Sequence, residues 1–369
     1  MIYFDNAATT KLNPLVSKWI KENMDEMWLN PSSAYAYEIK ELIEQARQTI
    51  LYLIGADEDD HIIFTSGGSE ANSMVAQIGK IYTTPIEHDS LLKHPFAYTC
   101  VVNEDGFVVK PLAFGKPYGE EDLPDILKGQ LDTIISIQLA NNEIGTIQDV
   151  KSLKNIRPEM LFHTDAVQAI GHIPVNVKEL GVDMLSASAH KFGGPKGVGF
   201  LYVNKRAYEY LVPIIYGTQE DGKRGSTYNA IPIIAMAKAL ELACADMRIN
   251  MEKTADVREF IQRYMDDMPC AHLNGTSDFS RRLPGNLNYR FDGYRGEQLQ
   301  EFLAEHEIYV STGSACNTAS GNPSHVLKAI GLSDDEADSS LRITVNENNT
   351  IEESLQFINI LKEGLDLLA

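Results

Sequence analysis

Short β-rich runs alternate with helical segments between residues 62 and 203, and each run ends in polar residues. The four runs are IIFTSGGSEAN (62–72), DTIISIQLANNEIG (132–145), MLFHTDAVQA (160–169) and VDMLSASAHKFGGPKGVGFLYV (182–203). Strands separated by helices predict a parallel sheet with helices on both faces. In such sheets the ligand lies beyond the carboxyl ends of the strands, so the polar ends predict an active site at that edge.

The pattern changes after Pro232, where apolar residues recur at helical spacing over many turns. This spacing predicts one long helix, or two helices joined at a kink. Beyond Pro269, a β-rich run at 286–291, a helical run at 297–307 and a closing strand with a C-terminal helix indicate a smaller α/β domain. We therefore predict an α/β protein with a large domain at 13–249 and a small domain formed by 1–12 and 250–369.

Composition favours a globular protein of the cytoplasm. The 369 residues include 32 Lys and Arg against 52 Asp and Glu, which gives a formal net charge of −20. Such an acidic surface repels phosphate backbones and anionic lipids, which argues against nucleic acid or a membrane surface as the main partner. No apolar run approaches the ~20 residues that span a bilayer, and the start MIYFDNAATT lacks the features of a signal peptide. The four cysteines form no close pairs, so we predict neither a disulfide framework nor a metal site.

Lys191 and Asp165 form the most informative pair of residues. Lys191 follows a β-rich run and lies among hydroxyl and glycine residues, where a lysine can be desolvated and made nucleophilic. Asp165 ends the preceding run, 26 residues upstream, which is close to one strand–helix–strand unit. A Schiff-base lysine with a carboxylate partner suits pyridoxal phosphate, because the carboxylate keeps the pyridine nitrogen protonated. Taken singly, Lys191 fits a surface lysine and Asp165 fits a helix N-cap.

Two further signals are weak alone. The turn Ser66-Gly67-Gly68-Ser69, between a strand and a helix, offers backbone N–H groups and a helix N-terminus to a phosphate. A Gly-Gly turn is nevertheless most often just a tight connection. His88 could stack on an aromatic ring, although a lone histidine is usually structural or exposed.

Motifs along nearly the whole chain resemble those of cysteine desulfurases, in the class V aminotransferase group of pyridoxal-phosphate enzymes. They include NNEIG (141–145), HTDAVQ (163–168), SAHKFGGPKGVGFLY (188–202) and TGSAC (312–316), and they extend from YFDNAATT (3–10) through NPSS (30–33) to Ser-Leu-Arg at 340–342. The resemblance implies the pyridoxal-phosphate transferase fold type I, with a mostly parallel, seven-stranded sheet in the large domain and a small α/β domain. It also implies a homodimer with active sites at the subunit interface.

The resemblance assigns a role to each matching residue. Lys191 matches the lysine that binds the cofactor covalently, Asp165 the partner of the pyridine nitrogen, and Cys316 the nucleophile that takes the sulfur. His88 matches the imidazole stacked on the ring and is counted with Lys191 and Cys316 among the catalytic residues. The other implied contacts are Gln168 at the phenolic oxygen; Gly68, Ser69, Ser188 and His190 at the phosphate; Thr227 at the phosphate of the other subunit; Asn142 and Arg342 at the cofactor and the substrate carboxylate; and Asn30 at the substrate.

The sequence departs from the family pattern in three segments. Tyr35 and Tyr37 follow NPSS where the family usually has a histidine, which bears on substrate positioning. Many relatives have the sequence Ser-Leu-Gly-Arg after the substrate arginine. This chain has other residues at 344–347, with Glu347 in place of the basic residue. Thr312 stands where serine is usual. None of these changes removes a residue that the chemistry requires.

The implied reaction converts L-cysteine to L-alanine and leaves the sulfur on Cys316 as a persulfide. The small residues around Cys316 fit a movable loop, from which the sulfur could pass to an acceptor protein such as an iron–sulfur scaffold or a tRNA-thiolation enzyme. Two alternatives stay open at this point. One is a related enzyme of the group, a selenocysteine lyase or an aminotransferase, and the other is a non-catalytic sulfur-transfer scaffold.

Overall fold

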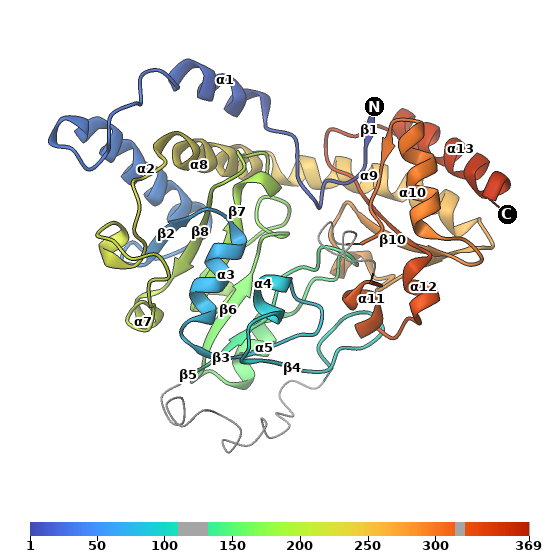
Figure 1. The fold of residues 1–369 in the computed structure, drawn as a ribbon, viewed down its shortest axis with the longest axis horizontal. Helices are drawn as coiled ribbons and strands as arrows, with labels where there is room; N and C mark the ends of the chain where they lie inside the picture. Colours follow the sequence, from blue (N-terminus) through green and yellow to red (C-terminus); the bar gives the residue numbers. More distant parts are fainter. Residues whose placement is uncertain (110–131, 314–321, 369) are drawn as a thin grey trace.

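The computed structural model describes residues 1–109, 132–313 and 322–368, and these form a large and a small lobe (Figure 1). The described strands of the large lobe make a seven-stranded sheet in the order β2-β8-β7-β6-β5-β3-β4. They are β2 (His61–Thr65), β3 (Gly79–Thr83), β4 (Ala97–Thr99), β5 (Asp132–Ser136), β6 (Leu161–Asp165), β7 (Met184–Ser188) and β8 (Gly199–Val203). Among them β8 runs antiparallel to both of its neighbours, while the other neighbouring strands pair in parallel. The predicted fold class, α/β with a mostly parallel seven-stranded sheet, is confirmed.

Helices cover both faces of this sheet. Because successive strand residues point to opposite faces, Ile62 and Phe64 pack in one core that includes three long helices, whereas Ile63 packs in another that includes two other helices. The first group is α1 (Pro14–Asn23), α2 (Tyr37–Leu53) and α8 (Ala230–Ala245), and the second is α3 (Gly68–Ala76) and α7 (Lys205–Tyr208). Short helices α4 (Asp89–Leu92), α5 (Val150–Ile156) and α6 (Val177–Leu180) complete the lobe. Since both faces are covered, every residue of β6, β7 and β8 is buried.

The small lobe contains both chain termini (Figure 1). Its antiparallel sheet has the order β12-β10-β9, and a two-residue strand at the N-terminus pairs in parallel with another short strand. The strands are β1 (Ile2–Tyr3), β9 (Ala271–Leu273), β10 (Asn286–Phe291), β11 (Ile308–Tyr309) and β12 (Ser340–Thr344). The helices are α10 (Gly296–Glu305), α11 (His325–Ala329), α12 (Asp334–Asp338) and α13 (Ile351–Leu368). Phe4, Tyr289 and Phe357 are fully buried in the core of this lobe.

The helical stretch after Pro232 is two helices that meet at Asp246. The first is α8, and the second is α9 (Met247–Asp266), whose apolar face packs in the small-lobe core. Together they run from one lobe to the other (Figure 1), so they fix how the lobes face each other across the site. None of the helices that the structure describes combines the length and apolar character needed to cross a membrane.

Candidate active site

A cavity of about 260 Å³ lies beyond the carboxyl ends of β5, β6 and β7. Its volume is near the lower end of small-molecule sites, which begin at about 300 Å³. The N-terminal arm, the start of α3 and strand β12 complete its wall. Residues predicted from the sequence that line this cavity are Gly68, Ser69, His88, Asn142, Asp165, Gln168, Ser188, His190, Lys191 and Arg342.

Lys191 reaches the cavity from a single 3-10 turn, η4 (Ala189–Lys191), directly after β7. Its Nζ donates hydrogen bonds to the carbonyl oxygens of Ala7 at 2.5 Å and Ala8 at 2.8 Å. The Nε2 of His172 donates to the Lys191 carbonyl oxygen at 2.7 Å. The amine is therefore held at the cavity by the N-terminal arm, a contact that the sequence did not predict.

Asp165 ends β6 and presents an oriented carboxylate to the same cavity. Its Oδ1 accepts from the Val167 N–H at 2.9 Å, and its Oδ2 accepts from Asn72 Nδ2 at 2.7 Å. Asn72 was missed in the sequence, although it lies three residues beyond Ser69 and so on the same face of α3. The Oδ1 atom of Asn72 is buried and has no hydrogen-bond partner among the described residues.

The start of α3 is the part of the wall best suited to an anion. The first backbone N–H groups of this nine-residue helix face outward from Gly68 and Ser69, where the helix dipole favours negative charge. A Cβ atom on Gly68 would lie 2.5 Å from Val167 Cγ2, so packing alone requires glycine there. Glu70 accepts two hydrogen bonds from Arg224, of 2.8 and 3.2 Å, and its Oε2 also accepts from the Ser66 N–H at 2.7 Å, so it occupies one N–H group of this turn.

Two histidines flank the cavity. The Nδ1 of His88 accepts from the Ser90 N–H at 3.1 Å and thereby caps α4. Burial, with a contribution from the charges of Lys191 and Lys196, lowers the pKa of His190 to about 4. His190 is therefore a neutral imidazole at neutral pH, and its Nδ1 lies 3.1 Å from Thr9 Oγ1.

Arg342 brings a buried guanidinium from β12 to the cavity. The side chain is 1% exposed; its Nη2 donates to Asp5 Oδ1 at 2.6 Å and its Nη1 to the Asn142 carbonyl oxygen at 3.2 Å. Its Nε is buried and unpartnered within the described part of the chain. The sequence did not predict a role for Asp5, although its place in the motif YFDNAATT could have indicated one.

Two predicted residues that the structure describes, Asn30 and Thr227, do not line this cavity. Asn30 is exposed, and its Oδ1 accepts from the Ser32 N–H at 3.0 Å within a surface turn. Thr227 is exposed on the loop before α8. Cys316 lies outside the described residues. The departures Tyr35 and Tyr37 are also surface residues, with 88% and 65% of their area exposed.

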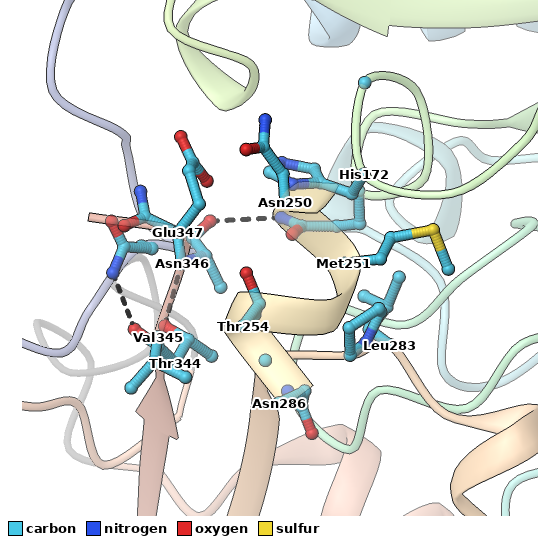
Figure 2. Close-up of a pocket in the computed structure, with 16 residues that line it drawn as sticks. His172, Asn250, Met251, Thr254, Leu283, Asn286, Thr344, Val345, Asn346 and Glu347 are labelled. Carbon is cyan, nitrogen blue, oxygen red and sulfur yellow. Dashed lines mark hydrogen bonds between the residues drawn. The ribbon is translucent and has the colours of Figure 1, made fainter. Parts of the chain in front are cut away.

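A second, smaller cavity of about 60 Å³ lies between the lobes (Figure 2). It adjoins the first cavity. Ala7 and Gln168 line both cavities, and the Gln168 amide donates to the Ala7 carbonyl oxygen at 3.0 Å. Its volume matches that of about two water molecules, so it is too small for a cofactor. Glu347 lines this second cavity, as Figure 2 shows, and is not among the residues that line the first.

Comparison with known proteins shows the family of this chain. The family described as Aminotransferase class-V matches residues 2–357, nearly the whole length. The chain belongs to this family. It is 42% identical to the cysteine desulfurase IscS of Dictyoglomus turgidum, a match that covers all of this chain and 95% of that protein. The class-V enzyme is thus, within its family, a cysteine desulfurase, as the sequence motifs predicted.

Solved structures agree with this placement. A NifS-like protein from Rickettsia africae is 31% identical, with a TM-score of 0.87 over 99% of each chain. A structure described as SspA in complex with cysteine is 30% identical, with a TM-score of 0.76 over 95% of this chain and 100% of the other. The predicted family and fold are therefore confirmed, and class-V aminotransferases and cysteine desulfurases are families of pyridoxal-phosphate enzymes.

Proposed function

We propose that the protein binds pyridoxal 5'-phosphate in the first cavity and converts L-cysteine to L-alanine, with Cys316 as the sulfur acceptor. The observation that carries the proposal is the meeting of Lys191, Asp165 and Arg342 on one cavity wall. These residues come from three different strand ends or strands, and together they provide an amine, an oriented carboxylate and a guanidinium. A cofactor aldehyde, a pyridine nitrogen and a substrate carboxylate are their complementary groups.

The cavity fits this cofactor in its polar chemistry. The N–H groups at the start of α3, with Ser69, Ser188 and His190, would hold the phosphate. Asp165 would accept a hydrogen bond from the protonated ring nitrogen, and Lys191 would form the covalent bond to the cofactor. The unpartnered Asn72 Oδ1 and Arg342 Nε support the assignment, because buried polar atoms in native proteins nearly always have a partner.

When bound, the cofactor supplies an electron sink for the electron pair released at the substrate α-carbon. The protein's own residues do the rest. Arg342 orients the substrate carboxylate through its buried guanidinium. The Lys191 amine would take the α-proton as a general base and return protons to the product carbon atoms.

Sulfur leaves L-cysteine in the step that follows. The Cys316 thiolate attacks the substrate sulfur, so an S–S bond forms as the Cβ–S bond breaks and its electron pair stays on carbon. Protonation of that carbon yields L-alanine, and the enzyme keeps one sulfur atom as a persulfide. No external oxidant is needed, because the two sulfur atoms are oxidised when the S–S bond forms and the substrate carbon is reduced when it keeps the electron pair of the C–S bond.

The described flank of the Cys316 segment supports this assignment. Ser311 and Arg342 pair through backbone hydrogen bonds of 2.6 and 3.1 Å. Ser311 is five residues before Cys316, so Cys316 lies within about 18 Å of it even in a fully extended chain. The segment therefore starts from a residue that is paired, through its backbone, with Arg342.

We also propose a homodimer that passes sulfur to an acceptor protein in the cytoplasm. A surface cleft of about 860 Å³ is lined by Pro31 and Tyr228, the neighbours of Asn30 and Thr227. Exposed aromatic residues occur in the same parts of the chain, among them Trp28, Tyr35, Tyr37 and Tyr216. A second copy seated here would cover them and could bring Thr227 to the phosphate site of its partner. Sedimentation should give the mass of a dimer, and a monomer at working concentration would contradict this proposal.

The activity itself has a direct test. The purified protein, loaded with pyridoxal phosphate, should release L-alanine from L-cysteine with a thiol reductant present and no keto acid added. Formation of an amino-acid product only when a keto acid is supplied would instead identify an aminotransferase. An L-selenocysteine assay in parallel would measure the preference between the two substrates.

Asp165→Asn should uncouple turnover from cofactor binding. The amide keeps the shape of the carboxylate but has no charge to stabilise the protonated ring, so turnover should fall about 100-fold or more, as for loss of one charge-stabilising group. Cofactor occupancy, measured from absorbance after gel filtration, should fall much less because the phosphate contacts remain. An unaltered turnover rate would show that another group protonates the ring.

Arg342→Lys should weaken substrate binding. Lysine keeps the charge but lacks the planar fork that binds carboxylate with two parallel hydrogen bonds. We expect KM for L-cysteine to rise about tenfold, the effect of about 1.4 kcal/mol of lost binding. The absorbance of the bound cofactor should change little. Steady-state kinetics that show an unchanged KM would mean that the substrate carboxylate binds elsewhere.

A further inference from the structure

Glu143, in the NNEIG motif, is a buried carboxylate that the proposed reaction does not use. Its side chain has no solvent exposure, and Oε2 accepts a hydrogen bond from Ser324 Oγ at 2.5 Å. Its Oε1 is buried without a hydrogen-bond partner among the described residues, and no ion pair there involves this carboxylate. The Glu143 backbone is fixed as well, because its carbonyl oxygen accepts from the Asn286 and Asn288 amides at 3.0 and 3.3 Å.

This arrangement carries a cost in stability. A buried carboxylate oxygen without a partner loses its hydration and gains nothing in return. An apolar residue of similar size would avoid that penalty. A functional role would explain why this position has a carboxylate in place of an apolar residue.

The contacts of Glu143 lie at both flanks of the segment that carries Cys316. Ser324, eight residues after Cys316, is the N-cap of α11 and belongs to the small lobe. Gly313, three residues before Cys316, has a φ of +155°, and a Cβ atom there would lie 3.5 Å from Glu143 Oε2. One carboxylate is thus hydrogen-bonded to the flank after Cys316 and lies close to the flank before it.

Glu143 itself belongs to the large lobe. It follows β5 and is the next residue after Asn142, which lines the cofactor cavity. The hydrogen bond between Glu143 and Ser324, with Gly313 close by, therefore couples the flanks of the Cys316 segment to the cavity that holds Lys191.

We propose that Glu143 is a positioning residue for sulfur transfer, which fixes both flanks of the Cys316 segment to the large lobe. The proposal rests on the proposed function of Cys316, but its contacts can be tested without any turnover. Glu143 does not line the cofactor cavity, so its loss should change the segment and leave the cofactor spectrum unchanged.

The test is limited proteolysis of the cofactor-loaded protein with a protease of broad specificity, read by mass spectrometry. Ser324→Ala removes the hydrogen bond to Glu143 and also the α11 cap, in which the Ser324 hydroxyl accepts from the Leu327 N–H at 3.2 Å. Cleavage between residues 313 and 324 should accelerate about two- to tenfold, the factor expected for the loss of one intramolecular hydrogen bond. Glu143→Ala should give the same acceleration, and Glu143→Gln, which keeps an acceptor for Ser324, a smaller one.

Ser333→Ala is the matched control. Ser333 is also the N-cap of a small-lobe helix, and its hydroxyl donates to the Glu336 carboxylate at 2.8 Å. That variant should cleave between 313 and 324 at the parent rate. The rate at which iodoacetamide alkylates Cys316 should change several-fold in Ser324→Ala and not in Ser333→Ala.

Two results would overturn the proposal. One is parent-like proteolysis and alkylation in both Ser324→Ala and Glu143→Ala. The other is loss of cofactor absorbance in Ser324→Ala, which would place this pair in the cofactor site instead. Failure of the proposed activity would look different, because the proteolysis result does not depend on whether L-cysteine is a substrate.

Discussion

Lys191→Ala abolishes turnover of L-cysteine and leaves a folded protein that no longer holds its cofactor covalently. Lys191 is both the attachment point and the group that moves the α-proton, and general acid–base catalysis alone contributes about 10²- to 10⁴-fold to a rate. The side chain is only half-buried, and its ammonium contacts two backbone carbonyl groups, so its removal leaves no large cavity in the core. We expect the absorbance band of the covalently bound cofactor to be absent and alanine release to fall at least 1,000-fold.

The measurement is borohydride reduction followed by peptide mass spectrometry. In the parent protein the reduced cofactor should remain on the peptide that contains residue 191, and in Lys191→Ala on no peptide. Lys196→Ala is the matched control, since Lys196 is an exposed lysine of the same SAHKFGGPKG segment. It should keep the cofactor and the activity. Normal desulfuration by Lys191→Ala would contradict the whole account of the site.

Cys316→Ser stops desulfuration and keeps the cofactor. Serine has nearly the same size, but its hydroxyl cannot accept a sulfur atom, so L-cysteine should bind and shift the cofactor spectrum without alanine release. We expect the rate to fall at least 1,000-fold, within the range seen when a nucleophile is removed. The measurement is stopped-flow absorbance for binding, combined with an alanine assay for turnover.

The remaining cysteines are poor candidates for this nucleophile. Burial, with the nearby Glu87 charge, raises the pKa of the Cys100 thiol to about 11. Burial also raises the pKa of Cys244 and Cys270 above the ordinary value. Because the thiolate is the reactive form, these three thiols are largely unreactive at neutral pH. Cys270→Ser is the control for Cys316→Ser and should retain the parent rate, whereas loss of activity in Cys270→Ser alone would reassign the nucleophile.

Much of the large lobe could be predicted from the sequence because its signals are local. Each strand of the parallel part is a short apolar run, and the polar residues that follow it, such as Asp165 after β6, necessarily lie at one edge of the sheet. The stretch between Ser188 and Gly199 contains no full helix that could carry the chain back to the other end of the sheet. The next strand, β8, therefore runs antiparallel to β7. The regular spacing of these elements is what made the cofactor site recognisable.

The contacts that were missed join distant segments. Asp5 binds Arg342 across 337 residues, and Asn72 binds Asp165 across 93. No pattern of hydrophobic residues or turns shows which polar side chains will form hydrogen bonds with each other. The packing of the N-terminal arm and of α3 determines these pairs. Asn30 and Thr227 are different, since a single chain leaves both of them on its surface. The predicted role of Thr227 depends on a second subunit, and that of Asn30 at the substrate stays a prediction.

Mass spectrometry after one turnover tests the central claim most directly. The cofactor-loaded protein is mixed with L-cysteine without a reductant, alkylated and digested, and alanine is measured in the same sample. The account predicts one additional sulfur atom on the peptide that contains Cys316, in an amount equal to the alanine released, with the peptides of Cys100, Cys244 and Cys270 unchanged. Alanine release without sulfur on Cys316, or the extra sulfur on another cysteine, would contradict it.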